Sequence, residues 1–240
     1  MNTLILLAAA LVPALLLWLY IWWKDPKKEP FGQLLKAFAL GVVVVFVASG
    51  LESFVKGSFW GANEQTYSLL DTTSIAFFVA AIPEESLKLL ALWLLLRRNP
   101  YFDEHFDGIV YAVSIGLGFA AIENLCYIIG GGEKWATIAI SRSLLAVPGH
   151  YAFAVLMGYF YSVYHFVDKS LKNKVLILLA PVLAHGIYDT LALSGMADQM
   201  IGGISAFVLI YFCIRLHKYA YKKIMVQCLA LKNVESKTTF

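Results

Sequence analysis

The amino-acid sequence predicts an all-α protein, a polytopic transmembrane helical bundle. Apolar residues make up 60% of its 240 residues and charged residues only 15%, whereas soluble domains typically carry about 45–50% apolar and about 25% charged residues. Several apolar stretches reach the length of about 20 residues that a helix needs to cross the hydrocarbon core of a bilayer. With a net charge of only +3, this composition excludes a soluble enzyme, a disordered chain and a nucleic-acid-binding domain.

Seven segments have the length and the apolar content of membrane-spanning helices. They cover residues 4–23, 31–54, 69–96, 108–130, 135–166, 175–194 and 201–217. The first segment ends in Trp22, Trp23 and Lys24 and has no basic region before it, so we expect a retained anchor and not a cleaved signal peptide. The connections are short, which predicts a single integral-membrane domain over residues 1–240.

The distribution of lysine and arginine predicts the orientation of the spans. If the N-terminus lies outside, the inner loops and the C-terminal tail hold most of the cations that lie between spans. These are Lys24, Lys27, Lys28, Arg97, Arg98, Lys169, Lys172, Lys174, Arg215, Lys218, Lys222, Lys223, Lys232 and Lys237, against Lys56 and Lys134 outside. Because inner loops of membrane proteins are enriched in lysine and arginine, this bias predicts an N-out, C-in protein.

Ionisable and amide side chains occur within the third to sixth spans, whereas the first, second and seventh are almost free of them. An ionisable side chain at mid-membrane costs about 2.5–3.5 kcal/mol on insertion scales, so it usually faces inward and serves a function. The third to sixth spans are therefore predicted to form the inner bundle. The side chains concerned are Glu84, Glu85, Lys88, Glu123, Asn124, Arg142, His150, His185 and Asp189.

Four of these side chains lie at a similar depth. With a rise of about 1.5 Å per residue, each is roughly 17–24 Å from the inner end of its span. Residues on four helices at one level can converge on a single cavity. Pro148, two residues before His150, is also expected to kink its helix and to open space there. The four residues predicted to share this site are Glu84, Glu123, His150 and His185.

The spacing within the third and sixth spans predicts which side chains share a face. Lys88 follows Glu84 by four residues, and Asp189 follows His185 by four, so each pair can interact. Glu85 is rotated by about 100° from Glu84 around the helix axis, so the two carboxylates are not expected to point to one spot.

Each feature also has a structural explanation. An intramembrane Glu–Lys pair can serve packing alone, and a single buried histidine is more often a core residue than a catalyst. Glu123 and Asn124 could hydrogen-bond between helices. Arg142 lies nearer the outer end of its span, where its side chain can reach the interface, and we interpret it as structural. Two carboxylate sites and two histidines at one depth are, however, costly to bury for packing alone.

Carboxylates and imidazoles without a nucleophile motif favour an activated water. The sequence contains no G-x-S-x-G, H-E-x-x-H or G-x-G-D motif. A glutamate general base beside a histidine can deprotonate a water that attacks a peptide carbonyl. Equally, Glu84, His150 and His185 could hold a zinc ion with an open position for water. A proton-coupled transporter or channel also buries such groups, and a non-catalytic scaffold protein is a further alternative.

The polar residues occur in motifs that resemble the PrsW family of intramembrane proteases. Residues 83–88, Pro-Glu-Glu-Ser-Leu-Lys, resemble the family's E-E-x-x-K motif, and residues 102–111 with 116–124 resemble its second block. His150 after Pro-Gly and residues 185–189, His-Gly-Ile-Tyr-Asp, resemble the third and fourth. The motif-bearing core covers about residues 80–190. The family is similar to the wider superfamily of CAAX prenyl endopeptidases and Abi proteins. The prenyl endopeptidases usually have Asn where this chain has Asp189.

The resemblance implies a multi-pass peptidase of the bacterial cytoplasmic (inner) membrane. Its substrate would be a membrane-anchored protein such as an anti-sigma factor, cut in or near the membrane segment. The enzyme itself would be in contact with the lipid bilayer. Glu84 would be the general base and His150 its partner in holding water. His185 and Asp189 would bind the oxyanion or support the site. The family has been described as both metallo- and glutamic-type, so zinc is the one cofactor implied. Further catalytic or supporting candidates are Glu85, Glu123, Lys88 and Asn124.

Overall fold

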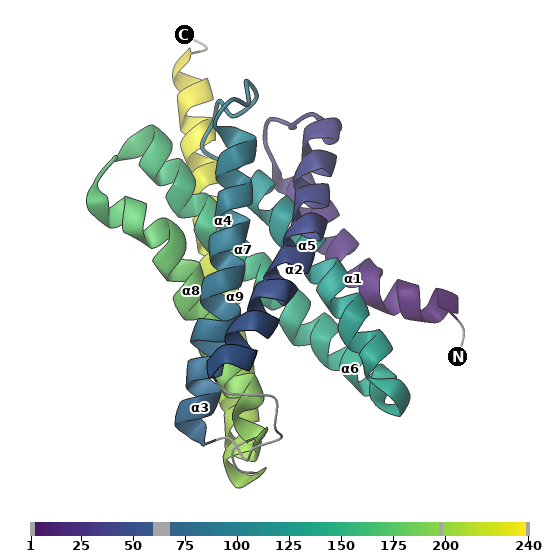
Figure 1. Ribbon diagram of the computed structural model, residues 1–240. Helices are drawn as coiled ribbons and strands as arrows, with labels where there is room; N and C mark the ends of the chain where they lie inside the picture. Colours follow the sequence, from purple (N-terminus) through teal and green to yellow (C-terminus); the bar gives the residue numbers. More distant parts are fainter. Residues whose placement is uncertain (1–2, 60–67, 197–198, 239–240) are drawn as a thin grey trace.

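The computed structural model of the chain describes residues 3–59, 68–196 and 199–238, and every regular element within these ranges is helical (Figure 1). Five helices are continuous and long: α1 (Thr3–Lys24), α2 (Phe31–Phe59), α5 (Asp107–Gly130), α8 (Leu171–Leu193) and α9 (Gln199–Thr238). Two other helical stretches are assembled from shorter pieces. The first comprises α3 (Leu69–Ser74), the π-helical η1 (Ile75–Ala81) and α4 (Ile82–Leu96).

The second assembled stretch contains most of the fifth predicted span. It comprises α6 (Trp135–Ser141), the π-helical η3 (Arg142–Ala146), α7 (Val147–Ser162) and the π-helical η4 (Val163–Val167). Short 3-10 turns, η2 (Gly132–Lys134) and η5 (Ser194–Met196), complete the order of elements.

The predicted all-α, multi-pass membrane fold is confirmed. Within the described residues, six helical segments are long and apolar enough to cross a bilayer: Thr3–Lys24, Phe31–Phe59, Asp107–Gly130, Gly132–Val167, Leu171–Leu193 and Met200–Cys228. They correspond to six of the seven predicted spans. The remaining one, residues 69–96, is helical throughout, but it differs from the other six in that every 18-residue stretch of it carries at least three charged residues. Three of these charges, Glu84, Glu85 and Lys88, belong to the E-E-x-x-K motif.

Two π-helical turns stand immediately before the two prolines that precede site residues. η1 leads to Pro83, next to Glu84, and η3 leads to Pro148, two residues before His150. Proline lacks an N–H and clashes with the preceding turn, and a π-helical turn accommodates both defects without ending the helix. A wider, π-helical turn therefore precedes Pro148, where the sequence predicted a kink and additional space. The equivalent π-helical turn before Pro83 was not predicted from the sequence.

The centre of the bundle is α5, which packs against α1, α2 and α7 (Figure 1). Every residue from 107 to 121 on this helix is buried. Glycines let the backbones approach closely: a Cβ on Gly118 would clash with the carbonyl of Phe38 in α2, and one on Gly158 in α7 would clash with Gly108. Close packing of small residues is the usual means of helix association in membranes. It sets α5 and α7 side by side, each carrying polar residues of the candidate site.

Candidate active site

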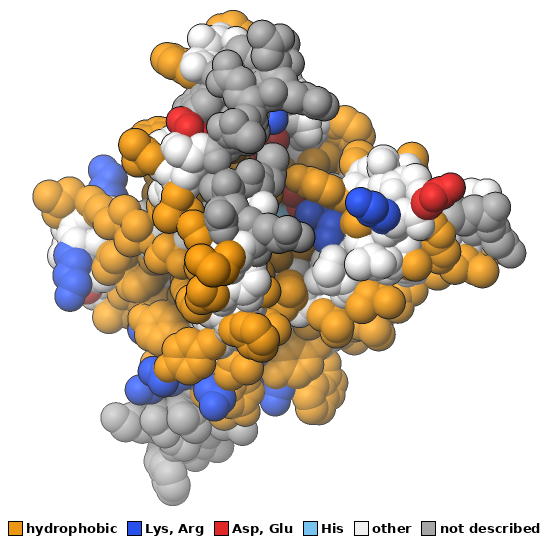
Figure 2. Space-filling view, turned by 90° about the horizontal axis from the view of Figure 1, so that it is seen from below, with side chains coloured by type: hydrophobic (Ala, Val, Ile, Leu, Met, Phe, Trp, Pro, Cys, Tyr) orange, Lys and Arg blue, Asp and Glu red, His pale blue; other side chains and the backbone are white. Residues whose placement is uncertain are grey.

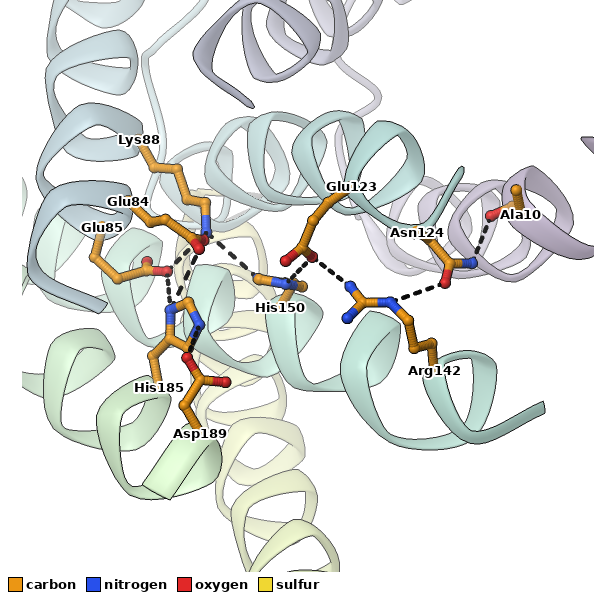
Figure 3. A network of polar contacts seen from close by, with 10 residues as sticks. All are labelled: Ala10, Glu84, Glu85, Lys88, Glu123, Asn124, Arg142, His150, His185 and Asp189. Carbon is orange, nitrogen blue, oxygen red and sulfur yellow. Dashed lines mark hydrogen bonds and ion pairs between the residues drawn. The ribbon is translucent and has the colours of Figure 1, made fainter. Parts of the chain in front are cut away.

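The two glutamates and the lysine of α4 form a buried ionic cluster. Lys88 Nζ donates to Glu84 Oε2 at 2.9 Å and to Glu85 Oε1 at 2.8 Å (Figure 3). All three side chains are at most 4% exposed. The expectation that the two carboxylates point apart is therefore wrong. Lys88 lies four residues from one glutamate and three from the other, so its ammonium can draw both flexible side chains to the same point.

Two histidines from other helices face this cluster with the same ring atom. His150 Nδ1 of α7 lies 3.4 Å from Lys88 Nζ, and His185 Nδ1 of α8 lies 3.0 Å from Glu85 Oε1. The two imidazole centroids are 5.2 Å apart, and the ring of His185 stacks on Phe153. Of the four residues predicted to share a site, Glu84, His150 and His185 converge on one place, and Glu123 contacts it through His150.

The far nitrogen of each imidazole contacts a carboxylate (Figure 3). His150 Nε2 lies 2.8 Å from Glu123 Oε2, and His185 Nε2 lies 3.3 Å from Asp189 Oδ2. A carboxylate on one ring nitrogen fixes the tautomer and the orientation of the ring. For His150 this arrangement places the proton on Nε2 and leaves the Nδ1 lone pair to accept from Lys88.

Both ring nitrogens of His185 face carboxylate oxygens, at Glu85 and Asp189. A neutral imidazole can donate from only one nitrogen. His185 is thus either protonated on both nitrogens, or its Nδ1 and the Glu85 carboxylate bind the same cation.

The donor set fits a metal ion. Glu84, Glu85, His150 and His185 each offer one ligand atom, and these atoms all lie within 4.8 Å of one another. Carboxylate oxygen and imidazole nitrogen are zinc ligands. Glu85 Oε2 is buried and makes no hydrogen bond within the described residues, as expected of an oxygen that has a further ligand. Lys88 already places one positive charge among the same atoms.

A second group of polar contacts involves the residues assigned to interhelical packing. Arg142 Nη2 lies 2.5 Å from Glu123 Oε2, and its Nε donates to Asn124 Oδ1 at 3.2 Å. Asn124 in turn donates to the carbonyl of Ala10 in α1 at 3.0 Å. The interpretation of Arg142 as a residue that reaches the interface is wrong. Its guanidinium turns inward and binds the carboxylate that contacts His150.

A cavity of about 820 Å³ borders the site. Among the described residues, its lining includes Glu84 but neither Glu85 nor Lys88. The residues at the ends of α2, α5 and α8 that line it lie on the predicted outer side, and Figure 2 shows charged side chains in a hollow on this face, within a surface of hydrophobic ones. The site residues in the lining are Glu84, Glu123, Arg142, His150, His185 and Asp189.

The sequence analysis missed one wall of this cavity. Ser49, Glu52, Ser53 and Lys56 of α2 line it together with the histidines. They follow one another at positions i, i+3, i+4 and i+7, which is the spacing of one helix face. A polar stripe in an otherwise apolar span was the available signal.

The chain is similar to one protein family, both by its family model and by its individual relatives. Residues 29–216 match the family model described as PrsW family intramembrane metalloprotease. The chain is 33% identical over 206 residues to Protease PrsW of Oceanobacillus iheyensis, covering 85% of this chain and 86% of that protein. It is 35% identical over 187 residues to Protease PrsW of Bacillus subtilis, covering 77% of this chain and 81% of that one.

A third relative, Protease PrsW of Clostridioides difficile, is 34% identical over 189 residues, with 75% of this chain and 76% of that protein covered. No solved structure matches the chain. The family model includes all four helical stretches that carry the polar site. The chain therefore belongs to the PrsW family of intramembrane proteases and is a multi-pass membrane peptidase.

Proposed function

We propose that this peptidase cuts a membrane-anchored protein in or near its membrane segment, with Glu84 as the general base that activates water. The observation that carries the proposal is the convergence of Glu84, Glu85, His150 and His185 within 4.8 Å beside a cavity of about 820 Å³. A carboxylate and imidazoles next to space for water and for a peptide segment are the groups that hydrolysis by activated water needs.

The cavity distinguishes the two adjacent glutamates. Glu84 lines it, whereas Glu85 is 1% exposed and is held between Lys88 and His185. The base must reach a water within hydrogen-bond distance. This supports Glu84 as the base and Glu85 as the residue that orients Lys88 and His185.

In the proposed reaction, Glu84 accepts a proton from water while the water oxygen attacks the peptide carbonyl carbon. The proton then passes from Glu84 to the leaving nitrogen, so the carboxylate is regenerated. The imidazolium form of His185, which lines the cavity, places positive charge next to the oxygen that becomes negative, and Lys88 adds a second positive charge behind Glu84. Charge placed before the reaction is an efficient way to stabilise an oxyanion in a buried site.

A zinc ion is the cofactor that the donor set could hold. Glu84, His150 and His185 would be its ligands, with Glu85 Oε2 as an additional oxygen. When bound, the ion would supply Lewis acidity to water or to the peptide carbonyl. His150 and His185 are already oriented for this role, since each has a carboxylate on the ring nitrogen that points away from the centre.

We further infer the cellular setting. The three relatives named above are bacterial proteins, which supports a bacterial cytoplasmic membrane. An N-out, C-in orientation would open the cavity to the outer side, so an anti-sigma factor cut close to its membrane span is a suitable substrate. One domain over residues 1–240 and a distant relation to CAAX prenyl endopeptidases are part of the same proposal. The order of the E-E and histidine motifs supports the relation.

The test compares Glu84→Gln and Glu85→Gln in protein reconstituted into liposomes with a single-span anti-sigma factor as substrate. Loss of the base should lower the cleavage rate by about 10²–10⁴-fold. Loss of the orienting carboxylate should cost about 10–100-fold. Both proteins should keep the thermal unfolding midpoint within a few degrees.

Elemental analysis and chelation accompany this test. Zinc in the wild type, and loss of cleavage on chelation with recovery on adding zinc, would assign the metal mechanism, while full activity of metal-free protein would assign the glutamic one. Cleavage that survives both glutamine substitutions would contradict the proposal under either mechanism.

A further inference from the structure

Arg142 is held by three residues of a single helix. Its guanidinium contacts Glu123 at 2.5 Å and Asn124 at 3.2 Å (Figure 3). Its Cζ also lies 3.9 Å from the ring centroid of Tyr127. The planar fork therefore divides its donors between two neighbouring side chains of α5 while its face rests on an aromatic ring one turn later. Lysine, a single rotatable point charge, cannot reproduce this geometry.

The same contacts continue in both directions. On one side, Asn124 is fixed by the carbonyl of Ala10, so the arginine is tied to α1 as well as to α5. On the other side, Glu123 Oε2 accepts from Arg142 and also contacts His150 Nε2 at 2.8 Å. One carboxylate oxygen thus joins the guanidinium to the imidazole.

The π-helical turn explains how Arg142 and His150 reach the same carboxylate. In a regular α-helix, positions eight apart differ by about 80° around the axis. A π-helical turn takes up one additional residue, which leaves an effective separation of seven and a difference of about 20°. η3 begins at Arg142 and ends at Ala146, so it lies between the two side chains and brings them to one face.

We propose that Arg142 is a positioning residue: by fixing Glu123, it holds the proton of His150 on Nε2 and turns the Nδ1 lone pair toward Lys88 and the two glutamates. The proposal rests on the function proposed above and adds to it. It assigns to the π-helical turn the task of aligning a three-residue relay, from guanidinium to carboxylate to imidazole. Such partners of a working histidine typically change activity or metal affinity by about 10–100-fold when removed.

The activity test uses Arg142→Gln, Glu123→Gln and the double variant, with Lys134→Gln as the control because that lysine is exposed. A positioning role predicts that R142Q lowers kcat by about 10–100-fold with KM nearly unchanged. It also predicts that R142Q adds no further loss in the E123Q background, because the arginine acts only through that carboxylate. R142K should recover only part of kcat, and K134Q should match the wild type.

The spectroscopic test does not depend on activity. In ¹⁵N-histidine-labelled, detergent-solubilised protein, with His150 assigned by a His150→Gln variant, the wild type should show the Nε2–H tautomer. R142Q should show a mixture of tautomers. If R142Q does not fold, R142K takes its place, and a smaller change in the tautomer populations of His150 is expected.

Two results would overturn the inference. One is an unchanged His150 signal in R142Q or R142K. The other is a double variant whose loss equals the product of the single losses with a raised KM, which would mean that Arg142 contacts the substrate. If wild-type protein cleaved nothing but the tautomer still depended on Arg142, the proposed function would fail while the positioning role stood.

Discussion

The ionic cluster on α4 shows how strongly single residues depend on one another in this protein. Lys88 contacts Glu84, Glu85 and His150, and no side chain of the ionic trio is more than 4% exposed. A buried ion pair contributes little net stability, because desolvation offsets the attraction, but removal of one partner leaves an uncompensated charge. The lysine therefore adds little net stability, but without it two buried carboxylates would lie side by side with no compensating charge.

Lys88→Met should lower the free energy of unfolding by about 3–5 kcal/mol, because two carboxylates would then lie buried side by side without their cation. The measurement is an SDS titration in mixed micelles. Lys36→Met, at an exposed position of α2, is the control and should change little.

The double variant Lys88→Met with Glu85→Gln should regain part of this loss, since one of the two unpaired charges is gone. A Lys88→Met protein as stable as the wild type would contradict the buried cluster.

At the scale of elements, the bundle depends on helices whose backbones are in direct contact at glycines. α5 and α7 meet at Gly108 and Gly158, where a Cβ on Gly158 would lie 2.6 Å from Ile109 Cα. These two helices also carry Glu123 and His150, so the contact that sets their spacing also sets the geometry of the site.

Gly158→Ala should destabilise the protein by about 1–3 kcal/mol, because overpacking a tight contact forces the backbones apart. Thermal unfolding in detergent measures the effect, and cleavage should fall with it. Gly50→Ala in α2 is the matched control, since a Cβ there meets nothing within 4 Å, and it should leave stability unchanged or raise it by up to about 1 kcal/mol. Equal responses of the two variants would rule out the close helix contact.

At the scale of the whole molecule, two loops on the predicted inner side carry several carboxylates. Lys27 pairs with Asp103 at 2.7 Å and joins the loop after α1 to the loop after α4. Burial raises the pKa of Asp25 and that of Glu29 to about 6, and it raises the pKa of Glu104 to about 7. In an unfolded chain such groups titrate near pH 4.

These shifts give stability a definite pH dependence. Because the folded state favours the protonated carboxyls, their contribution is complete below about pH 4 and is lost as the pH rises through 6 to 7. The thermal unfolding midpoint in detergent should thus decrease as the pH is raised from 5 to 8. Glu104→Gln should raise the midpoint most at pH 8 and less at pH 5, where only part of the contribution has been lost.

Glu133→Gln, at an exposed site in the turn η2, is the control for this pH series and should reproduce the wild-type curve. A Glu104→Gln curve parallel to that of the wild type would show that the carboxyl titrates as it does in the unfolded chain.

Much of the fold and part of the site could be predicted from the sequence. Apolar length identified the membrane helices, and six of the seven predicted spans meet the same measure in the structure. Charges inside apolar spans identified Glu84, His150 and His185, because burying them is costly wherever the helix packs. A buried layer of Glu, His and Asp suits a transporter as well as a protease, and the family match decided between them.

Residue composition and span length are local properties, so the sequence by itself determined the class of protein, the spans and the set of polar residues that require an explanation. The tertiary structure decided which of those residues touch: it brought Glu85 to Glu84, turned Arg142 onto Glu123, and placed a polar face of α2 in the lining of the cavity. The physical reason is rotation about the helix axis. Each residue turns the chain by about 100°, so one extra residue in a π-helical turn redirects every side chain beyond it, and no pattern of hydrophobicity records that change.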